Sequence, residues 1–422
     1  KARGDHYDAG MRWPFELLQN ALDAGPREGR SQVKVALRRT AGATVFEHDG
    51  APFTMQEFAA LVSGGSSKEF ESRETTGRFG TGFLVTHVLA QRSRVSGLVR
   101  TGAGLEQFDL ALDRAGDEQA IMENLLRCND AITAAVLAAS AEDEATARFE
   151  YEIDDESALN WGVEAFENAL LYLFACCPGL GEVTVGETEG NSRTWVPGEP
   201  AQRTYGGATI LERSIGVVSD RHPSSSERYR CFRVSSNATA NSGVLMVARQ
   251  VGEGWRVYLP PGELPRIFCR YPLRGTHYLG LNLVLEGGLE VDQERRSPML
   301  TTASKGALRG ALGSVLHAVQ FALEEGYQGA HLLARVGPLG STFPGGAEDS
   351  EWWREQLADL AQQLARLPLV ETRQGRGPAV SVDDGWYADF IVPRLTGPTG
   401  PDETTLERVW PLVDAAGNLY PP

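Results

Sequence analysis

The feature that most constrains this chain is the segment ELLQNALDAG (residues 16–25), in which polar and apolar residues follow a helical period. Asn20 and Asp23 follow Glu16 by four and seven residues, so the three share one stripe of an α-helix. The pattern predicts a helix that begins near residue 12 and ends at Gly25. Any solvated amphipathic helix has a polar stripe, so the stripe alone leaves its role open. The opposite half is apolar and is predicted to face a core: Phe15, Leu17, Leu18, Ala21 and Leu22.

A second motif is EHDGAPF (residues 47–53), which is typical of a strand that ends in Asp49 and turns at Gly50. A carboxylate beside a glycine that lets the backbone approach closely can accept a hydrogen bond from an exocyclic amine, such as that of adenine. The alternative is an ordinary Asp-Gly turn. The alternation of a strand predicts that the side chain of His48 points to the face opposite Asp49.

A third motif is GRFGTGF (residues 77–83), whose glycines precede the helical pattern FLVTHVLAQ. Successive backbone N–H groups and the positive end of a helix dipole can form a cradle for an anion. The motif follows a Gly/Ser/Thr-rich loop rather than a strand, and the pattern GxxxxGK[ST] is absent. It is therefore neither a Rossmann turn nor a Walker A loop. His87, inside the apolar pattern after the motif, is interpreted as a core residue.

Charge and cysteine usage narrow the class of protein. The net charge of −16, from 40 basic and 56 acidic residues, argues against a protein that coats nucleic acid through bulk electrostatics. No apolar run approaches the roughly 20 residues that cross a bilayer, so no membrane partner is expected. The five cysteines show neither a CxxC pair nor zinc spacing, and adjacent Cys176 and Cys177 are predicted to be core residues. An odd number of cysteines without a disulfide framework fits a reducing cytoplasm.

Helical and strand patterns alternate along the first two hundred residues, which predicts an α+β sandwich of a mixed sheet with helices on one face. A polar connector, DRHPSSSER (residues 220–228), predicts a domain boundary just before it. A β-rich block extends from there to Val291, and a long helical pattern closes it. The Gly/Pro-rich stretch VGPLGSTFPGG then separates a last region with one further helical pattern, SEWWREQLADLAQQLARL.

The three motifs in this order, E-x-x-x-N-x-x-D-A, D-G and G-x-x-G-x-G-F, resemble the nucleotide-binding motifs of the GHKL ATPases. That superfamily includes gyrase-type topoisomerases, ninety-kilodalton heat-shock chaperones, histidine kinases and MutL mismatch-repair proteins. The resemblance implies a Bergerat-fold ATP-binding domain over 1–218 with a lid at about 64–82, and a transducer-like β-α-β middle domain over 219–335. The remainder, 336–422, is predicted to be a helical and irregular extension.

The resemblance also implies a role for each motif residue, with ATP and Mg²⁺ as the cofactors. Asn20 would hold Mg²⁺ through its amide oxygen, Glu16 would activate the water that attacks the γ-phosphate, and Asp23 would support the nucleotide. Asp49 would bind the adenine amine, with Gly50 allowing the close approach, and Thr209 in GGATILE would help to hold the base. The family's second box often reads D-x-G-x-G, from which this chain departs. The resemblance assigns further nucleotide contacts to Ser66, Ser67, Lys68, Gly77, Arg78, Phe79, Gly80, Thr81, Gly82 and Phe83.

Within the superfamily, DGAPFT, GRFGTGF and the later stretch 264–300 are similar to sacsin-type, heat-shock-chaperone-like proteins. Those chaperones place an arginine of the second domain on the γ-phosphate, in a loop before a long helix. QERRSPML occupies that place here, so Arg295 or Arg296 is the expected sensor, with Gln293 beside it and Lys305 as a weaker candidate. Two solvated arginines are the alternative interpretation.

The function expected from the resemblance is a slow, ATP-driven conformational switch that acts on a partner protein or a fused effector. By analogy, such a protein could belong to a bacterial defence system and form a homodimer on ATP binding. A MutL- or topoisomerase-like ATPase acting on DNA is an alternative, which a salt-dependent DNA-binding assay would discriminate. A non-hydrolysing nucleotide-binding scaffold is another, and intact Glu16 and Asn20 argue against it. A histidine kinase of this fold needs no water-activating base, so Glu16 also argues against that class.

Overall fold

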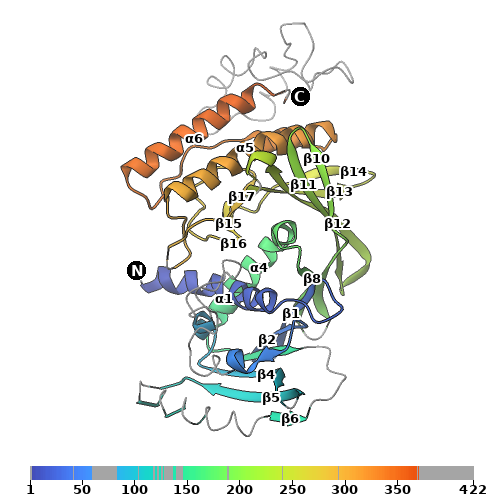
Figure 1. Ribbon diagram of the computed structural model, residues 1–422, viewed down its shortest axis with the longest axis vertical. Coiled ribbons are helices and arrows are strands. Elements are labelled where there is room, and N and C mark those ends of the chain that lie inside the picture. The colour runs from blue at the N-terminus through green and yellow to red at the C-terminus, as the bar shows by residue number, and fades with distance from the viewer. Residues whose placement is uncertain are drawn as a thin grey trace. The chain divides into compact units, whose positions relative to one another are not determined.

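The computed structural model (Figure 1) describes residues 2–40, 42–58, 83–102, 104–116, 119–120, 123–124, 127, 136–138, 146–187, 190–239, 241–292, 294–367 and 369. These residues form two compact units. The first comprises Lys1–Pro200 and Arg213–Arg230, and the second Ala201–Glu212 and Cys231–Pro422. Among the described residues, no helix has the length and apolar character required to span a bilayer.

The first unit is a mixed β-sheet with helices packed on it. The strands pair in the order β6-β5-β4-β7-β2-β1-β8-β9, and the second half of β11 (Ala208–Ser219) continues the sheet beside β9. Strands β1 and β8 are parallel, as are β3 and β4, and the other pairs are antiparallel. The elements are α1 (Ala2–Ala24), β1 (Val33–Thr40), β2 (Ala43–His48), β3 (Phe53–Thr54), η1 (Phe83–Val88), β4 (Arg92–Thr101), β5 (Gly104–Asp113), β6 (Val136–Ala138), β7 (Ala147–Glu152), α4 (Glu156–Cys176), β8 (Leu180–Glu187) and β9 (Asn191–Pro197).

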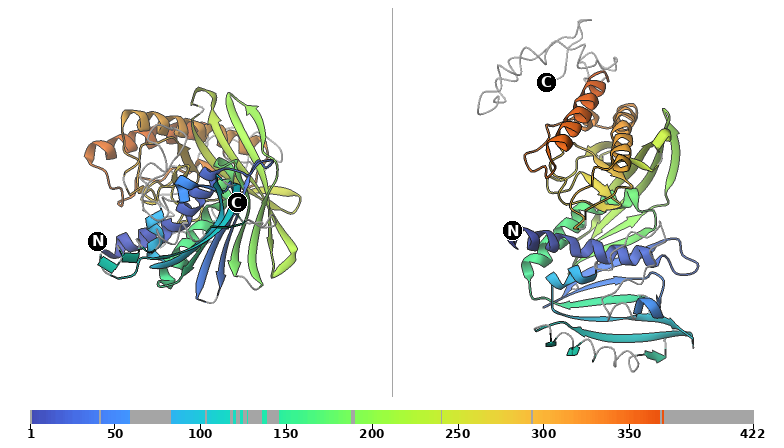
Figure 2. Two further views of the ribbon diagram at one scale, coloured as in Figure 1. Left: turned by 60° about the horizontal axis from the view of Figure 1, so that its bottom comes forward. Right: turned by 60° about the vertical axis from the view of Figure 1, so that its left-hand side comes forward.

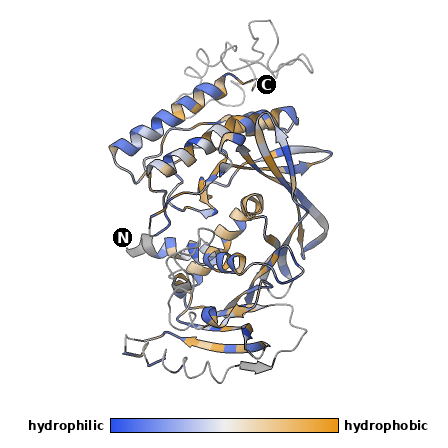
Figure 3. Cartoon of the chain, in the orientation of Figure 1, coloured by the Kyte–Doolittle hydropathy of each residue, from blue (hydrophilic) through white to orange (hydrophobic). Residues whose placement is uncertain are grey.

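Helices α1 and α4 cover one face of this sheet, and they pack directly on each other (Figures 1 and 2). The side chain of Asp155 caps α4 by accepting hydrogen bonds from the backbone N–H groups of Ser157 and Ala158, at 2.8 and 3.0 Å. Helix α4 is largely hydrophobic along its length, as Figure 3 shows, because α1 and the sheet both pack against it. The predicted α+β class, a mixed sheet with helices on one face, is confirmed.

Charged side chains line the other face of this sheet, alternating along the strands with buried aromatic residues. The Arg94 side chain on β4 bonds to Asp109 on β5, with Nε and Oδ1 2.6 Å apart. Glu47 on β2 accepts hydrogen bonds from Arg148 on β7 and, at 2.6 Å, from Arg38 on β1. These cross-strand pairs of opposite charge keep the open face solvated and add modestly to strand pairing.

Helix α1 begins ten residues before the start predicted from the sequence. Its first turns have no capping signal in the sequence, but they pack on α4: the rings of Tyr7 and Trp161 lie 4.8 Å apart and His6 bonds to Asp155 at 2.7 Å. Pro14 lies inside the helix and has no N–H to offer the carbonyl group of Gly10. Tertiary contact with α4 therefore extends this helix where local pattern does not.

The second unit is a smaller sheet covered by two helices. Its strand pairs include β10–β11, β13–β14, β13–β17 and β15–β16, which are antiparallel, and β15–β17, which is parallel. Its elements are β10 (Ala201–Tyr205), the first half of β11, the second half of β12 (His222–Ser236), η2 (Asn237–Thr239), β13 (Ser242–Val251), β14 (Gly254–Tyr258), β15 (Ile267–Cys269), β16 (Tyr271–Pro272), β17 (Val284–Gly287), α5 (Thr302–Glu324), η3 (Ala330–Ala334) and α6 (Ala347–Ala365).

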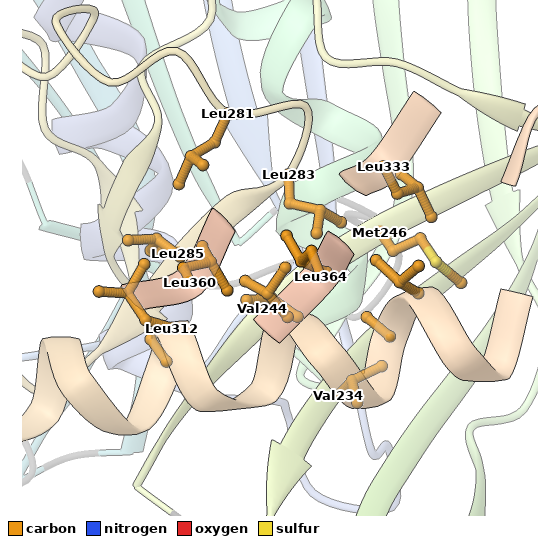
Figure 4. Close-up of a cluster of buried hydrophobic side chains, with 14 of the residues drawn as sticks. Val234, Val244, Met246, Leu281, Leu283, Leu285, Leu312, Leu333, Leu360 and Leu364 are labelled. Carbon is orange, nitrogen blue, oxygen red and sulfur yellow. The ribbon is translucent and has the colours of Figure 1, made fainter. Parts of the chain in front are cut away.

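The core of this unit lies between its sheet and α5, and Figure 4 shows part of it. Val244 and Met246 from β13 and Leu285 from β17 pack against α5, and Leu360 and Leu364 bring α6 into the same cluster. The ring of Trp353 on α6 is fully buried there. The part of the predicted C-terminal extension that the structure describes therefore contributes to the core of the second unit.

The two units divide the chain differently from the segments predicted around residue 218. The polar connector 220–228 is a two-residue turn followed by the start of β12, so it lies within a β-hairpin. Strands β11 and β12 are long enough to contribute residues to both units. A Pro/Ser-rich composition marks a turn here and not a linker between domains.

Replacing Gly162 of α4 with alanine should destabilise the first unit. An added Cβ atom would lie 2.0 Å from Nε1 of Trp13, which donates a hydrogen bond to the carbonyl group of Ala158 at 3.2 Å. Overpacking of this kind costs about 1–3 kcal/mol. We expect a lower midpoint of thermal unfolding by circular dichroism for Gly162→Ala, whereas Gly179→Ala, with nothing within 4 Å of its added Cβ, should leave it nearly unchanged. Equal midpoints for the two variants would contradict this packing.

Candidate functional site

Glu16, Asn20 and Asp23 lie on α1 as predicted, and this polar stripe is less exposed than the face of a solvated helix. Glu16 is 6% exposed, and Asn20 and Asp23 are half-buried. Of the predicted core residues, Leu22 is half-buried and the others are buried: Phe15, Leu17, Leu18 and Ala21. A buried carboxylate is unusual on an ordinary amphipathic helix, because removing it from water costs free energy unless a partner compensates.

Arg12 is the partner of Glu16. Its Nε donates a hydrogen bond of 2.6 Å to Oε1 of Glu16 from one turn earlier on the same helix, and both side chains are largely buried. A charge-assisted bond at this spacing fixes the orientation of the carboxylate. The arrangement can hold an ionised acid in an enclosed position, as a general base requires.

Asn20 and Asp23 add two oxygen-bearing side chains to the same stripe. Gln19 donates a hydrogen bond from Nε2 to Oδ2 of Asp23 at 3.4 Å. Among the described residues, no group of three or more His, Cys, Asp or Glu side chains is placed to hold a metal ion. The amide and carboxylate oxygens of the stripe are the kind of ligand that Mg²⁺ accepts when phosphate and water supply the rest of its shell, so the donor set fits that ion.

The end of α1 is hydrogen-bonded to the turn after β2. The backbone N–H of Ala51 donates to the carbonyl oxygen of Gly25 at 2.8 Å, and Pro26 and Gly50 form an isolated antiparallel bridge. A Cβ atom on Gly50 would lie 3.0 Å from the carbonyl oxygen of Gly25 and 3.3 Å from that of Ala21. Glycine is therefore needed at position 50 so that the turn can approach the helix, and the helix ends next to the Asp49-Gly50 turn.

The carboxylate of Asp49 is buried and is held from two sides. The backbone N–H of Lys34 donates to Oδ1 at 2.6 Å, and the backbone N–H of Asp49 donates to the carbonyl oxygen of Lys34 at 3.2 Å. The guanidinium of Arg30 forms an ion pair with Oδ2. Asp49 is 6% exposed. It is an anchored hydrogen-bond acceptor, whereas the side chain in an ordinary Asp-Gly turn faces solvent.

Thr146 contacts His48, the residue before Asp49, although the sequence motifs do not single it out. Its backbone N–H donates to the carbonyl oxygen of His48 at 2.9 Å, and its fully buried hydroxyl accepts a hydrogen bond of 2.6 Å from Nε of Arg27. The pairing of β7 with β2 produces this contact. The only signal in the sequence is a threonine directly before the alternating strand ARFEYE. This signal is weak unless it is known which strands pair.

Thr209 is the threonine predicted from the sequence to help hold the base. It is on β11 in the second unit, and its hydroxyl donates to Oδ1 of Asn237 at 2.9 Å. Glu16, Asn20 and Asp49 all belong to the first unit. The contact of Thr209 with the base stays a prediction, and Thr146 is the threonine that contacts the residue before Asp49 within the first unit.

The 3₁₀-helix that begins at the last residue of the glycine-rich segment packs against the same helix, α1. That residue is Phe83, and the 3₁₀-helix is η1. The helical pattern predicted after this segment is thus a 3₁₀-helix. The other predicted contacts of the lid and the glycine-rich segment lie outside the described residues: Ser66, Ser67, Lys68, Gly77, Arg78, Phe79, Gly80, Thr81 and Gly82.

Arg295 and Arg296 lie in a tight loop of the second unit. The side chain of Asp292 organises it by accepting hydrogen bonds from the backbone N–H groups of Arg296 at 2.7 Å and of Ser297 at 3.3 Å. Arg295 has a φ of 52°, a left-handed conformation that is strained for a non-glycine residue. Lys305 forms an ion pair of 3.7 Å with Asp349 of α6. Gln293 lies outside the described residues.

His48 and His87, both in the first unit, make structural contacts. His48 is buried, stacks on Phe149, and accepts a hydrogen bond of 3.2 Å at Nδ1 from the backbone N–H of Gly50, which leaves the proton of the neutral ring on Nε2. Burial, with a smaller effect of Arg27, lowers the pKa of His48 to about 4. His87 is half-buried beside Arg114, and burial followed by that charge lowers its pKa to about 4.

No protein-family model matches the sequence, and no curated protein is similar to it. Several solved structures align with part of the chain. The B subunit of DNA gyrase from Myxococcus xanthus aligns at 14% identity and a TM-score of 0.30, over 48% of this chain and 60% of that one. The ATPase and transducer domains of DNA topoisomerase II from Balamuthia mandrillaris align at 12% and 0.30, over 48% and 55%. The ATPase region of Saccharomyces cerevisiae topoisomerase II aligns at 11% and 0.30, over 48% and 57%.

This chain spans 55–60% of the length of those proteins. At such identities and TM-scores, the similarities carry no argument about function.

His48 should make the stability of the first unit depend on pH. The unfolded chain binds a proton at this side chain near pH 6.5, whereas the folded chain does so only near pH 4, because the pKa is lowered on folding. The unfolded state therefore binds more protons between these values, and the free energy of unfolding falls as the pH is lowered through that window, by up to about 3 kcal/mol. Above pH 6.5 this contribution is fully present.

The substitution His48→Asn tests this dependence, because asparagine keeps an acceptor for the N–H of Gly50 but does not titrate. Urea unfolding at a series of pH values between 4 and 7 should show a shallower loss of stability for the variant than for the wild type, and His87 supplies part of what remains. Parallel pH profiles would show that His48 is not the buried neutral group described.

Proposed function

We propose that this chain binds ATP and hydrolyses it slowly with Mg²⁺, as a conformational switch of the GHKL type. The observation that supports the proposal most is the contact between the end of α1 and the turn at Asp49. It consists of the backbone hydrogen bond from Ala51 to Gly25 and the β-bridge between Pro26 and Gly50. It brings an oriented buried acid, an amide and a second carboxylate to one region of the first unit. These are the groups needed for a base-reading acceptor, a metal ligand and a general base.

Glu16 is the proposed general base. Arg12 orients its carboxylate, which would position the attacking water and take a proton from it. Asn20 would bind Mg²⁺ through its amide oxygen, with Asp23 in support. Bound Mg²⁺ supplies positive charge that offsets the charge of the phosphates.

Asp49 is the proposed acceptor for the exocyclic amine of adenine, with Thr146 beside it. The anchoring of Oδ1 by Lys34 fixes the direction in which the carboxylate accepts. The buried hydroxyl of Thr146 would support the base or a water that bridges to it. The geometry that favours Thr146 over Thr209 is its backbone contact with His48, the residue before Asp49.

The remaining parts of the proposal rest on the motifs. Residues 64–82 would close over the nucleotide as a lid, with Phe83 leading back to α1. Arg295 or Arg296 would stabilise charge on the transferring phosphoryl group and couple the second unit to the nucleotide state. The output would be a changed contact with a protein client or effector, in the manner of sacsin-like and heat-shock-chaperone-like proteins, with homodimerisation and bacterial defence as the contexts to test.

Removing the Glu16 carboxylate should separate binding from hydrolysis. The variant Glu16→Ala is expected to bind ATP with Mg²⁺ but to release phosphate at a rate lower by about 100-fold or more, as loss of a general base implies. The matched control is Glu164→Gln, which removes an exposed acid from α4. Phosphate release that is unchanged in Glu16→Ala would remove Glu16 from its proposed role.

The variant Asp49→Asn should lose adenine nucleotide binding, because the amide of asparagine offers a donor where the base presents another donor. Isothermal titration calorimetry is expected to show no measurable heat with ATP. Asp109→Asn, which disrupts an exposed carboxylate–arginine pair on β5, is the control and should bind normally. Normal affinity in Asp49→Asn would place the nucleotide pocket elsewhere.

A further inference from the structure

Two cysteine side chains are in contact at the end of α4, away from the residues of the candidate site. Sγ of Cys176 and Sγ of Cys177 lie 3.9 Å apart, so that one thiol can donate a weak hydrogen bond to the other. Both residues are thiols; Cys177 is 3% exposed and Cys176 is half-buried. The proposed function uses neither of them.

The contact between the two thiols results from the way in which the helix ends. Inside an α-helix, the side chains of adjacent residues diverge and do not face each other. Pro178 has no N–H with which to continue the helix, and a proline also disfavours helical backbone in the residue before it. Cys177 accordingly has a φ of −118° and a ψ of 81°, outside the helical region. This change of φ turns the side chain of Cys177 toward that of Cys176.

Cys177 also holds the end of α4 in place through its backbone. Its N–H donates to the carbonyl oxygen of Leu173 at 2.7 Å, and its own carbonyl oxygen accepts from the N–H of Leu180 at 3.0 Å. The same oxygen accepts from Nη1 of Arg213 at 3.5 Å, a buried arginine of β11 whose charge complements the negative end of the helix dipole. A change of backbone at Cys177 would therefore reach β11, the strand that contributes residues to both units.

A disulfide between adjacent residues has an unusual geometry. Their Cα atoms are about 3.8 Å apart across a trans peptide bond, whereas most disulfides join Cα atoms roughly 4.4–6.8 Å apart. The bond closes a small ring that contains the peptide bond between residues 176 and 177, so the backbone there has to distort. Strain of this kind makes a disulfide easy to reduce, and labile disulfides are the regulatory ones. In a reducing compartment, such a bond is transient.

We propose that Cys176 and Cys177 form a redox modification site, which small disulfides convert reversibly to a disulfide between the two residues. Closing the ring moves the backbone of Cys177 and weakens its contacts with Leu173 and Arg213. The site therefore links the oxidation state of its surroundings to the attachment of α4 to β11. This inference is independent of nucleotide binding.

The reaction proceeds by two thiol–disulfide exchanges. The thiolate of Cys176, the more exposed of the pair, attacks one sulfur of the small disulfide, forms a mixed disulfide and displaces one small thiolate. The thiolate of Cys177 then attacks Sγ of Cys176, forms the bond within the chain and displaces the second small thiolate. The two cysteines lose two protons and two electrons, and the small disulfide gains them as it becomes two thiols.

The test exposes the full wild-type chain to a series of glutathione buffers that contain increasing fractions of glutathione disulfide, followed by alkylation and tryptic digestion. The peptide of residues 149–193 contains Cys176 and Cys177 and no other cysteine. In oxidising buffers we expect this peptide to carry no alkyl group and to be lighter than the dithiol peptide by two hydrogen atoms. Dithiothreitol added before alkylation should restore the doubly alkylated peptide.

Two variants test the order of the steps. Cys177→Ser should stop at the mixed disulfide, with glutathione on Cys176. Cys176→Ser should take up little or no glutathione in the folded chain, because Cys177 is buried. Cys269→Ser, which removes a half-buried cysteine of β15 in the second unit, is the matched control and should oxidise at residues 149–193 as the wild type does.

Thermal unfolding measures the effect on the fold. The oxidised wild type should unfold at a lower midpoint than the reduced chain, because so short a loop constrains the unfolded chain little and does not offset the lost contacts. Cys176→Ser treated in the same way should keep its midpoint.

Two results would overturn the inference. One is a wild-type peptide that stays doubly alkylated, or that keeps glutathione on Cys176, in excess glutathione disulfide. The other is an oxidised chain that is as stable as the reduced one, because the disulfide would then leave the end of α4 undisturbed.

Discussion

The joint between the end of α1 and the turn after β2 is the constraint on which the candidate site depends. One backbone hydrogen bond, from Ala51 to Gly25, and one bridge, between Pro26 and Gly50, hold helix and strand together. The joint leaves no room for a side chain at position 50. Because it fixes where the helix ends, it also fixes the distance between the striped side chains and the carboxylate of Asp49.

The polar groups around this joint are buried, and most have a defined partner. Glu16 has Arg12, Asp49 has Lys34 and Arg30, and Thr146 has Arg27. Burial of polar groups without partners would cost more than a small domain can offset, so these bonds are needed for stability as well as orientation. They also affect ligand binding, because a ligand at Asp49 would meet a carboxylate that is already paired with the guanidinium of Arg30.

The sequence predicts the parts of this arrangement that are local. The spacing of Glu16, Asn20 and Asp23 predicts the stripe, and the dipeptide Asp49-Gly50 predicts a close backbone approach, because both signals lie within a few residues. The pair Arg12–Glu16 also has a local signal, its four-residue spacing, although Arg12 is not among the residues predicted for the site. The start of α1 at Ala2 depends on packing against α4, which local pattern does not encode.

The parts that the sequence leaves open depend on strand pairing over long separations. Thr146 contacts His48, the residue before Asp49, only because β7 pairs with β2, about a hundred residues earlier in the chain. Thr209 has an equally suitable local pattern but lies in the other unit. The interleaving of the two units results from the length of β11 and β12, whereas composition at 220–228 indicates only a turn. The roles of the lid and of the arginine loop remain predictions from the motifs.

The most direct measurement is a crystal structure of the chain with Mg²⁺ and a non-hydrolysable ATP analogue. The account predicts that the adenine amine donates to Asp49, that the amide oxygen of Asn20 contacts the metal ion, and that Glu16 faces the terminal phosphate. An analogue bound away from α1, with the stripe and Asp49 in the same contacts as in the nucleotide-free chain, would contradict it.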